Sequence, residues 1–359
     1  MTTQSKHKWL TPHNYLSLKL WETIGTGLFN LFIFLMIFAY LFPMVFMVAT
    51  SLMEGPQLTD RNAPAYPAKH VRYEYEGKTY PVYKVPFPNG EVRELALVEP
   101  GRTSSQFIDP KNPEAGLILW EGNRRPLIGV YEFHVTLNNF TTLFGALPLS
   151  RMLQNTLIMT IIAEIGVLLS SIVVAYGFSR FPLPGGDLLF YVLIATILIP
   201  EKVTLIPTYF FFVRILHWEG TWLPILVPFF FGNAVYIFLL RQNFKSIPKD
   251  IDEAAMIDGA GPLRVLFQVI LPQCWPTVIT VSLLHFFYMW NETRQASLYL
   301  SISRDIAPIS FGVQNFQSLA PIQNQLQASA LILMIVPVIV LLISQRYFMR
   351  DMVVTGMEK

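Results

Sequence analysis

The chain alternates long apolar segments with shorter polar ones. Six segments are apolar over about the 20 residues that a helix needs to cross a hydrocarbon core: residues 28–50, 155–178, 188–212, 222–241, 275–295 and 328–348. The first is the clearest, because no charged residue occurs from Thr23 to Met53. The pattern predicts an all-α integral membrane bundle of six transmembrane helices. Several segments contain proline, which neighbouring helices can accommodate in lipid.

One polar, proline-rich region, residues 54–136, follows the first predicted span. Parts of it alternate between apolar and polar positions, as strands do. The strand-like runs are VRYEYEGKTYPVYKV (71–85), the sequence around the Asn89-Gly90 turn signal, AGLILWEG (115–122) and LIGVYEFHV (127–135). We expect a small β-rich insertion, and the alternative is a loosely ordered loop. About eighty residues can bury only a minor core.

Composition supports a membrane protein. Hydrophobic residues make up 53% of the chain and charged residues 14%, and the mean hydropathy is +0.44; soluble domains carry about 25% charged residues. The net charge of +2 gives no reason to expect a nucleic-acid partner. The single cysteine, Cys274, excludes a disulfide framework and a multi-cysteine metal site. We expect no metal, and we expect Cys274 to act as a small apolar residue near a helix start.

The distribution of lysine and arginine predicts the orientation, because these residues favour the cytoplasmic side. With a cytoplasmic N-terminus, the inner segments contain eleven cations and the short outer loops three. The inner ones are Lys6, Lys8, Lys19, Arg180, Arg241, Lys245, Lys249, Arg264, Arg346, Arg350 and Lys359, and the outer ones are Arg214, Arg294 and Arg304. We therefore expect both termini inside, with residues 1–27 as a cytoplasmic lead-in and 54–136 outside.

A short polar stretch, DIDEAAMIDGAGPLRVLFQVILPQ (250–273), lies between the fourth and fifth spans, on the predicted cytoplasmic side. Asp250 and Glu253 are spaced like a capping box at a helix start. Gly259 can adopt the left-handed conformation that ends a helix, and Pro262 suits the first position of a second helix. The stretch predicts two short helices joined by a sharp turn. On periodicity alone, an amphipathic helix on the membrane surface is the alternative.

The spacing in this stretch resembles the EAA loop of bacterial ABC-importer permeases. Glu253-Ala254-Ala255 is followed after three residues by Gly259, after nine more by Val269, and then by Leu271-Pro272. The run IPKDIDEAAMIDGAGPLRVLFQVILPQCWP (247–276) is similar to the carbohydrate branch, the maltose-type G subunit. The likeness covers residues 137–359. Val269 stands where isoleucine is usual, Thr293 stands where phenylalanine is usual, and the 54–136 insertion is unusually long.

The resemblance implies a type I ABC importer topology, with residues 137–359 as the permease core and 246–272 as a cytoplasmic coupling loop. The loop would seat in a cleft of an ATPase subunit, with Glu253 beside a basic residue there. The coupling residues would be Asp250, Glu253, Ala254, Ala255, Asp258 and Gly259. It also implies a second permease subunit in a heterodimer, an ATPase dimer that binds ATP and Mg, an extracytoplasmic solute-binding protein, and location in the bacterial inner membrane.

The residues also offer candidates for a translocation path. Ionisable residues within spans are functional candidates by default, and these are Glu164 and Glu201. The fifth predicted span ends in LLHFFYMWNETR, where ring faces stand beside amide and carboxylate groups, as sugars prefer. The candidates there are His285, Tyr288, Trp290, Asn291 and Glu292. The alternatives are a structural hydrogen bond for Glu164 and an interfacial aromatic belt for the others.

The predicted function is therefore a transport subunit that carries out no catalysis. The expected solute is a sugar or oligosaccharide, and the alternative is a polyol or a glycerol-phosphate-type solute. EGKTY (76–80) is not a phosphate-binding loop, because Arg72 occupies the position where that motif needs its first glycine. Two alternatives come from other classes: an intramembrane enzyme, for which no catalytic motif is found, and an ion-coupled carrier, which usually contains paired repeats.

Overall fold

The structure is a computed structural model, and it describes residues 12–88, 90–319 and 322–356. The chain divides into two compact units, Met1–Thr136 and Leu137–Lys359. Lys6 and Lys8, part of the predicted cytoplasmic lead-in, and Lys359 lie outside the described residues.

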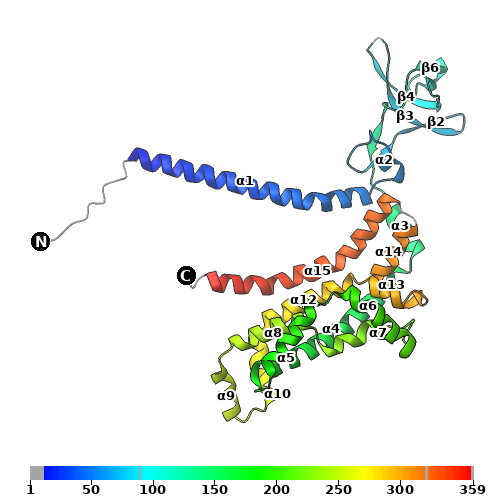
Figure 1. Cartoon of the computed structure of the whole chain (residues 1–359). Coiled ribbons are helices and arrows are strands. Elements are labelled where there is room, and N and C mark those ends of the chain that lie inside the picture. The colour runs from blue at the N-terminus through cyan, green and yellow to red at the C-terminus, as the bar shows by residue number, and fades with distance from the viewer. Residues whose placement is uncertain (1–11, 89, 320–321, 357–359) are drawn as a thin grey trace. The chain divides into compact units, whose positions relative to one another are not determined.

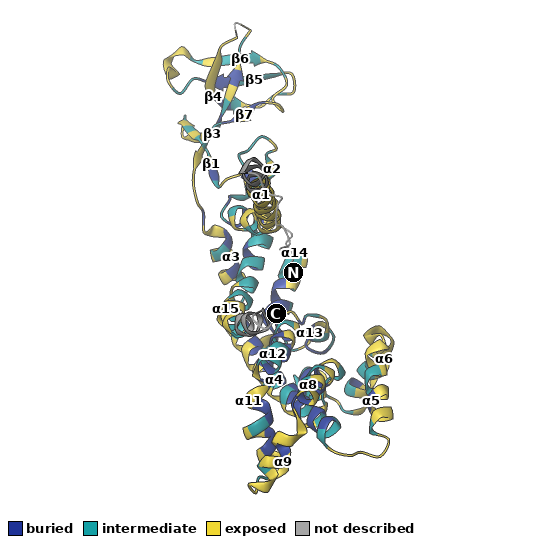
Figure 2. Cartoon of the chain, turned by 90° about the vertical axis from the view of Figure 1, so that its left-hand side faces the viewer, coloured by how far each residue is buried: buried dark blue, intermediate teal, exposed yellow. Residues whose placement is uncertain are grey.

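The first unit contains one long helix and the predicted β-rich insertion (Figure 1). Its elements are α1 (Pro12–Ser51), α2 (Gly55–Thr59), β1 (Ala68–His70), β2 (Arg72–Tyr75), β3 (Lys78–Pro86), β4 (Val92–Glu99), β5 (Ser104–Ile108), the 3-10 turn η1 (Pro113–Ala115), β6 (Leu117–Glu121), β7 (Ile128–Gly129) and β8 (Tyr131–Phe133). Helix α1 begins at Pro12, so residues 12–27 of the expected lead-in already belong to this helix. Its apolar segment is exposed (Figure 2), as a span in contact with lipid would be.

The insertion folds as an antiparallel sheet in the order β2-β3-β4-β5-β6, with β7 paired to β3, and a separate ladder of β1 with β8. The prediction of a β-rich insertion is confirmed, although the sequence analysis missed β1 and β5. Val85, Leu95 and Phe107 form a small core on one face. The sequence EGKTY contains the β2–β3 turn, where Glu76 and Gly77 both have positive φ, as the tightest hairpins require. Gly90 also has positive φ in its turn, whereas Asn89 lies outside the described residues.

The second unit is helical. Its elements are α3 (Asn138–Ala146), α4 (Leu149–Arg180), α5 (Gly186–Ala195), α6 (Glu201–Phe210), α7 (Leu223–Leu226), α8 (Ala234–Ser246), α9 (Lys249–Ile257), α10 (Pro262–Val265), α11 (Leu271–Gln273), α12 (Trp275–Trp290), α13 (Arg294–Tyr299), α14 (Ile309–Leu319) and α15 (Gln323–Gly356), with the 3-10 turns η2 (Thr196–Leu198), η4 (Val227–Phe231) and η6 (Arg304–Ile306) and the π-helical turns η3 (Phe211–Ile215) and η5 (Leu266–Ile270).

Four described helical segments are long and apolar enough to cross a membrane: Trp21–Ser51, Leu149–Arg180, Leu223–Ser246 and Gln323–Tyr347. Two more segments qualify only as bent pairs, Gly186–Leu198 with Glu201–Ile215 (93°) and Pro262–Gln273 with Trp275–Trp290 (84°). The prediction of one continuous helix is therefore wrong over 188–212, whereas over 275–295 α12 is continuous and the bend lies before it, at Cys274. The first breaks because Pro200 disfavours a helical conformation at Ile199, which is extended. The second helix ends at Trp290.

Helix α4 lies at the centre of this unit. Its small residues allow close approach, as is usual between membrane helices: a side chain at Gly166 would meet the Phe230 ring of η4 at 2.8 Å. Further along, Val167 and Ala175 pack in one buried cluster with Leu240 of α8 and Leu266 of η5. Cys274 is buried in the same cluster, as expected for a small apolar residue. This packing places α4 against both η4 and the 247–274 segment.

Candidate functional site

The segment between α8 and α12 contains the two predicted short helices, α9 and α10, at one end of the second unit (Figure 1). Helix α9 ends in a Schellman motif: the N–H of Gly259 donates to Met256 and the N–H of Ala260 donates to Ala255. Gly259 has a φ of +84°, which glycine adopts without strain. Pro262 begins α10, as predicted. Sequence reasoning therefore located this turn correctly.

The predicted capping box is wrong. Helix α9 begins at Lys249, after an extended Pro248, so Asp250 lies inside the first turn and no side chain caps the helix. There Asp250 and Asp252 place negative charge near the positive end of the helix dipole. The second helix is longer than one short helix and passes through Leu271-Pro272. It continues through the π-helical turn η5 into α11 and breaks at Cys274.

Only one narrow side of α9 faces the bundle (Figure 2). Asp252 is buried and Ala255, one turn later, is half-buried. The other predicted coupling residues, Asp250, Glu253, Ala254, Asp258 and Gly259, are exposed. Large apolar side chains are exposed beside them: Ile251, Met256, Ile257, Leu263 and Phe267. The segment therefore presents an apolar surface with a carboxylate fringe away from the bundle.

The last turn of α4 holds this segment at three points. The guanidinium of Arg180 lies 2.5 Å from the Asp252 carboxylate, and its Nη2 donates to the carbonyl of Ile247 over 3.1 Å. One turn earlier, the Tyr176 hydroxyl donates to the carbonyl of Pro262. Burial raises the pKa of the Asp252 carboxyl, and the charge of Arg180 opposes this shift. Sequence reasoning did not identify Arg180 or Asp252 as site residues, because nothing in one sequence pairs residues so far apart.

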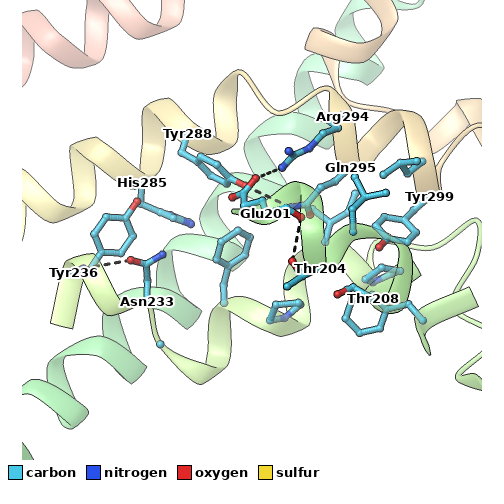
Figure 3. Close-up of a pocket in the computed structure, with 18 residues that line it drawn as sticks. Glu201, Thr204, Thr208, Asn233, Tyr236, His285, Tyr288, Arg294, Gln295 and Tyr299 are labelled. Atoms are coloured by element: carbon cyan, nitrogen blue, oxygen red, sulfur yellow. Dashed lines mark hydrogen bonds and ion pairs between the residues drawn. The ribbon is translucent and has the colours of Figure 1, made fainter. Parts of the chain in front are cut away.

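A cavity of about 330 Å³ lies elsewhere in this unit, among α6, η3, α7, η4, α8, α12 and α13 (Figure 3). Polar groups in its lining are Glu201, Thr204, Thr208, Asn233, Tyr236, His285, Tyr288, Arg294, Gln295 and Tyr299. Arg294 donates to the carboxylate of Glu201, and both side chains remain partly exposed. Rings of Phe212 and Phe229 complete the wall, so flat apolar faces and hydrogen-bonding groups alternate around one space.

The cavity contains three of the seven predicted path residues, Glu201, His285 and Tyr288. A fourth predicted path residue, Glu164 of α4, lies next to one of these cavity residues: its Oε2 is hydrogen-bonded to Nδ1 of the fully buried His285 over 2.8 Å. The Nε2 atom of His285 is also buried, and it has no hydrogen-bond partner within the described part of the chain.

The other three predicted path residues do not line this cavity. Trp290 donates to the carbonyl of Leu333 in α15. Asn291 is exposed and bonds within its own helix. Glu292 is buried, and its carboxylate caps α13 by accepting from the N–H of Gln295 over 2.7 Å. The residues that sequence reasoning missed, such as Asn233 and Arg294, come from other elements.

No group of three or more histidine, cysteine, aspartate or glutamate side chains that could hold a metal ion occurs in the described ranges. The structure thus contains two candidate sites. One is the exposed α9–α10 segment, which α4 holds, and the other is the cavity lined by polar and aromatic side chains.

Comparisons with known proteins agree with this architecture. The sequence profile of the binding-protein-dependent transport system inner membrane component matches residues 166–354. The sn-glycerol-3-phosphate transport system permease protein UgpE of Pectobacterium atrosepticum is 30% identical over 69% of this chain and 84% of its own. The osmoprotective compounds uptake permease protein GgtD of Synechocystis is 31% identical over 60% of this chain and 72% of its own.

A solved structure shares the fold. It is a bacterial ABC transporter involved in the import of the acidic polysaccharide alginate, with a TM-score of 0.60 and 18% identity over 92% of this chain and 98% of that one. The chain therefore belongs to the family of binding-protein-dependent transport system inner membrane components: it is a permease subunit of an ABC importer, it is not itself an enzyme, and ATP binds to a separate ATPase subunit.

Proposed function

We propose that this chain is one of two different permease subunits of an ATP-driven importer for a sugar or a related neutral polyhydroxylated solute. It has six spans, counting each bent pair as one, with both termini and the α9–α10 segment in the cytoplasm and the β-rich insertion outside. An extracytoplasmic binding protein delivers the solute, and a dimer of ATPase subunits binds ATP and Mg.

The α9–α10 segment supports the coupling role. Contiguous exposed apolar surface commonly marks a protein interface, and Met256, Ile257 and Leu263 provide it here. The exposed Ala254 permits close approach of a partner backbone, and the exposed Glu253 provides a charge for a basic residue in the ATPase cleft. We propose six residues for the contact with the ATPase subunit and for the turn that ends α9: Asp250, Glu253, Ala254, Ala255, Asp258 and Gly259.

The links from α4 explain how this segment can transmit a displacement. Arg180 binds the residue range before α9 at Ile247 and α9 itself at Asp252, and Tyr176 binds the first residue of α10, so α9 and the start of α10 would move with α4. Closure of the ATPase subunits on ATP would pull α9 and swing α4 with it. Because α4 packs against η4, whose residues line the cavity, the same movement would reshape the cavity. Transport then proceeds by alternating access between the two sides of the membrane.

The charge balance in the cavity supports a neutral solute. Its lining contains one carboxylate, Glu201, and one guanidinium, Arg294, and the two are paired. A phosphate-bearing solute would require an uncompensated cation. Ring faces of Tyr236, Tyr288 and Phe229 suit the C–H faces of a sugar, while hydroxyl and amide groups suit its hydroxyls.

The glycerol-phosphate alternative has one supporting observation, the likeness to a permease named for sn-glycerol-3-phosphate transport. The paired state of Arg294 favours the neutral solute over it.

Uptake into proteoliposomes that contain both permeases, the ATPase subunit and the binding protein tests the proposal. We expect uptake of a neutral sugar that requires ATP and does not respond to a proton gradient. Glu253→Lys should reduce both copurification of the ATPase and uptake. Uptake driven by a proton gradient without ATP, or full copurification and uptake by Glu253→Lys, would refute the respective part of the proposal.

A further inference from the structure

A second cavity lies where three candidate spans begin or end. It is lined by the last turn of α4, the first turn of α5, the last turn of α8 and the first residues of α9, and its volume is about 820 Å³. The candidate spans end at Arg180 and Ser246, and a bent pair begins at Gly186. The cavity therefore lies at the level of a membrane surface. The proposed function makes this the cytoplasmic surface, and the inference rests on the proposed function only for that orientation.

The lining of this cavity is strongly basic. It contains four cationic side chains, Arg180, Arg241, Lys245 and Lys249, and one carboxylate, Asp187. Arg180 is neutralised by Asp252, which is not part of the lining. Arg241 has a buried side chain that stacks on the Phe190 ring and lies 3.4 Å from the exposed Asp187. Lys245 and Lys249 are exposed and form no ion pair with any described residue.

Backbone groups add to this positive field. Helices α5 and α9 both begin at the cavity, with Gly186 and Lys249 in its lining. Neither helix has a side-chain cap at its N-terminus. The N-terminus of a helix carries partial positive charge and free N–H groups, which together favour an anion such as phosphate. Two uncapped helix starts and a cluster of cations therefore meet at one space, and the acidic residues of the first turns, Asp187 in α5 and Asp250 and Asp252 in α9, offset part of this positive charge.

The rim of the cavity is apolar. Phe181, Leu183 and Leu188 belong to the lining, and their side chains are exposed. A free phosphate ion would gain nothing from these residues. A phospholipid would place its headgroup among the cations and its upper acyl chain against the rim. Basic clusters and pockets on the cytoplasmic side of membrane helices suit this chemistry.

We propose that this cavity binds the headgroup of an anionic membrane phospholipid. Lys245 and Lys249 contact the phosphate, and the rim contacts the acyl chain. Because Lys249 is the first residue of α9, the bound lipid lies directly beside the segment that we propose as the ATPase contact.

The test uses the full chain in nanodiscs of phosphatidylcholine that contain a spin-labelled phosphatidylglycerol, with no ATP and no transported solute. The readout is the relative affinity for phosphatidylglycerol over phosphatidylcholine, obtained from the motionally restricted fraction of labelled lipid. We expect this affinity ratio to fall about fivefold for each of Lys245→Gln and Lys249→Gln. The matched control, Lys202→Gln with Arg264→Gln, removes two exposed cations outside the cavity and should leave the ratio unchanged.

An unchanged ratio in the Lys245→Gln/Lys249→Gln variant would overturn the proposal. Displacement of the labelled lipid by millimolar inorganic phosphate would overturn the lipid assignment and show a site for free anions instead. Because the readout requires neither ATP nor uptake, failure here leaves the proposed transport function intact. Conversely, a failed uptake experiment leaves the lipid result standing.

Discussion

Arg180 in the last turn of α4 forms a buried ion pair with Asp252 in α9, across 72 residues of sequence. Nε of Arg180 lies 2.5 Å from Oδ2 of Asp252. Both side chains are less than one-tenth exposed. Asp252 is the only fully buried residue of α9, so this pair fixes the exposed helix to the bundle. The pair gives a physical path by which a pull on α9 reaches a membrane-spanning helix.

Removing one member of this pair should be costly, because a buried charge without its partner costs about 3–5 kcal/mol. We expect Asp252→Ala to destabilise the chain by about this amount and to abolish ATP-driven uptake. Asp250→Ala, in the same helix turn but exposed, should change stability by about 0.5 kcal/mol or less. Thermal unfolding in detergent compares the two. Equal effects of the two substitutions would show that the ion pair has no special role.

The turn at Gly259 can be tested with a neighbouring glycine as its control. Space is open around a side chain at either Gly259 or Gly261, so that only the backbone conformation differs. Gly259 has a φ of +84° and Gly261 has −72°. We expect Gly259→Ala to cost about 1–2 kcal/mol and to weaken ATPase copurification. Gly261→Ala should cost only about 0.5 kcal/mol, because it places alanine at the N-cap of α10, and it should leave copurification unchanged. Wild-type copurification by Gly259→Ala would argue against a required left-handed turn.

Glu201 should determine the charge preference of the transported solute. Glu201→Gln leaves the positive charge of Arg294 uncompensated in the cavity lining. The uptake of an anionic analogue should therefore rise relative to the uptake of the neutral sugar. We expect a change of about tenfold in the uptake ratio, equivalent to about 1.4 kcal/mol. Lys202→Gln is the control, because this exposed neighbour is not part of the lining. If Glu201→Gln leaves the ratio unchanged, the cavity does not select the solute.

The raised pKa of Tyr131 predicts that the insertion loses stability at alkaline pH. Its hydroxyl donates to Asp60 over 2.6 Å, and burial together with this carboxylate raises its pKa above the ordinary 10.0. The protonated form is favoured in the folded state, so its contribution to stability is complete below pH 10.0 and is lost as the pH rises through the raised pKa.

Phenolate absorbance during an alkaline titration of the full chain checks this prediction. The titration curve of the wild type minus that of Tyr131→Phe should correspond to one tyrosine, with a pKa well above the ordinary 10.0. Tyr66→Phe, which removes an exposed tyrosine, serves as the control. A difference curve for Tyr131 that resembles the control would contradict the hydrogen bond to Asp60.

Hydropathy and local turn chemistry predicted much of the fold. The β-rich insertion, the left-handed Gly259 and the helix start at Pro262 follow from short-range rules that one sequence contains. The bend at Pro200 also had a signal, because the residue before a proline avoids the helical conformation. Length and apolarity outweighed that signal, so a continuous helix was expected.

Long-range pairs could not be predicted in the same way. Asp252 looked like one acid among several, and only the fold shows that it alone faces Arg180. The cavity combines residues of seven elements, and helix bends decide which side of each element faces it. Trp290 is the last residue of α12, which contributes to the cavity, and Asn291 follows it, but neither residue lines the cavity.

Site-specific crosslinking from α9 tests the coupling role most directly. Ala254→Cys in a Cys274→Ala background would carry a photoreactive maleimide within the assembled transporter, and Leu119→Cys in the exposed part of the insertion would serve as the control. We predict that position 254 crosslinks to the ATPase subunit, with a yield that changes when ATP is added, and that position 119 does not. Crosslinks from position 254 to lipid alone, or labelling of that cysteine by a reagent confined to the outside, would contradict the account.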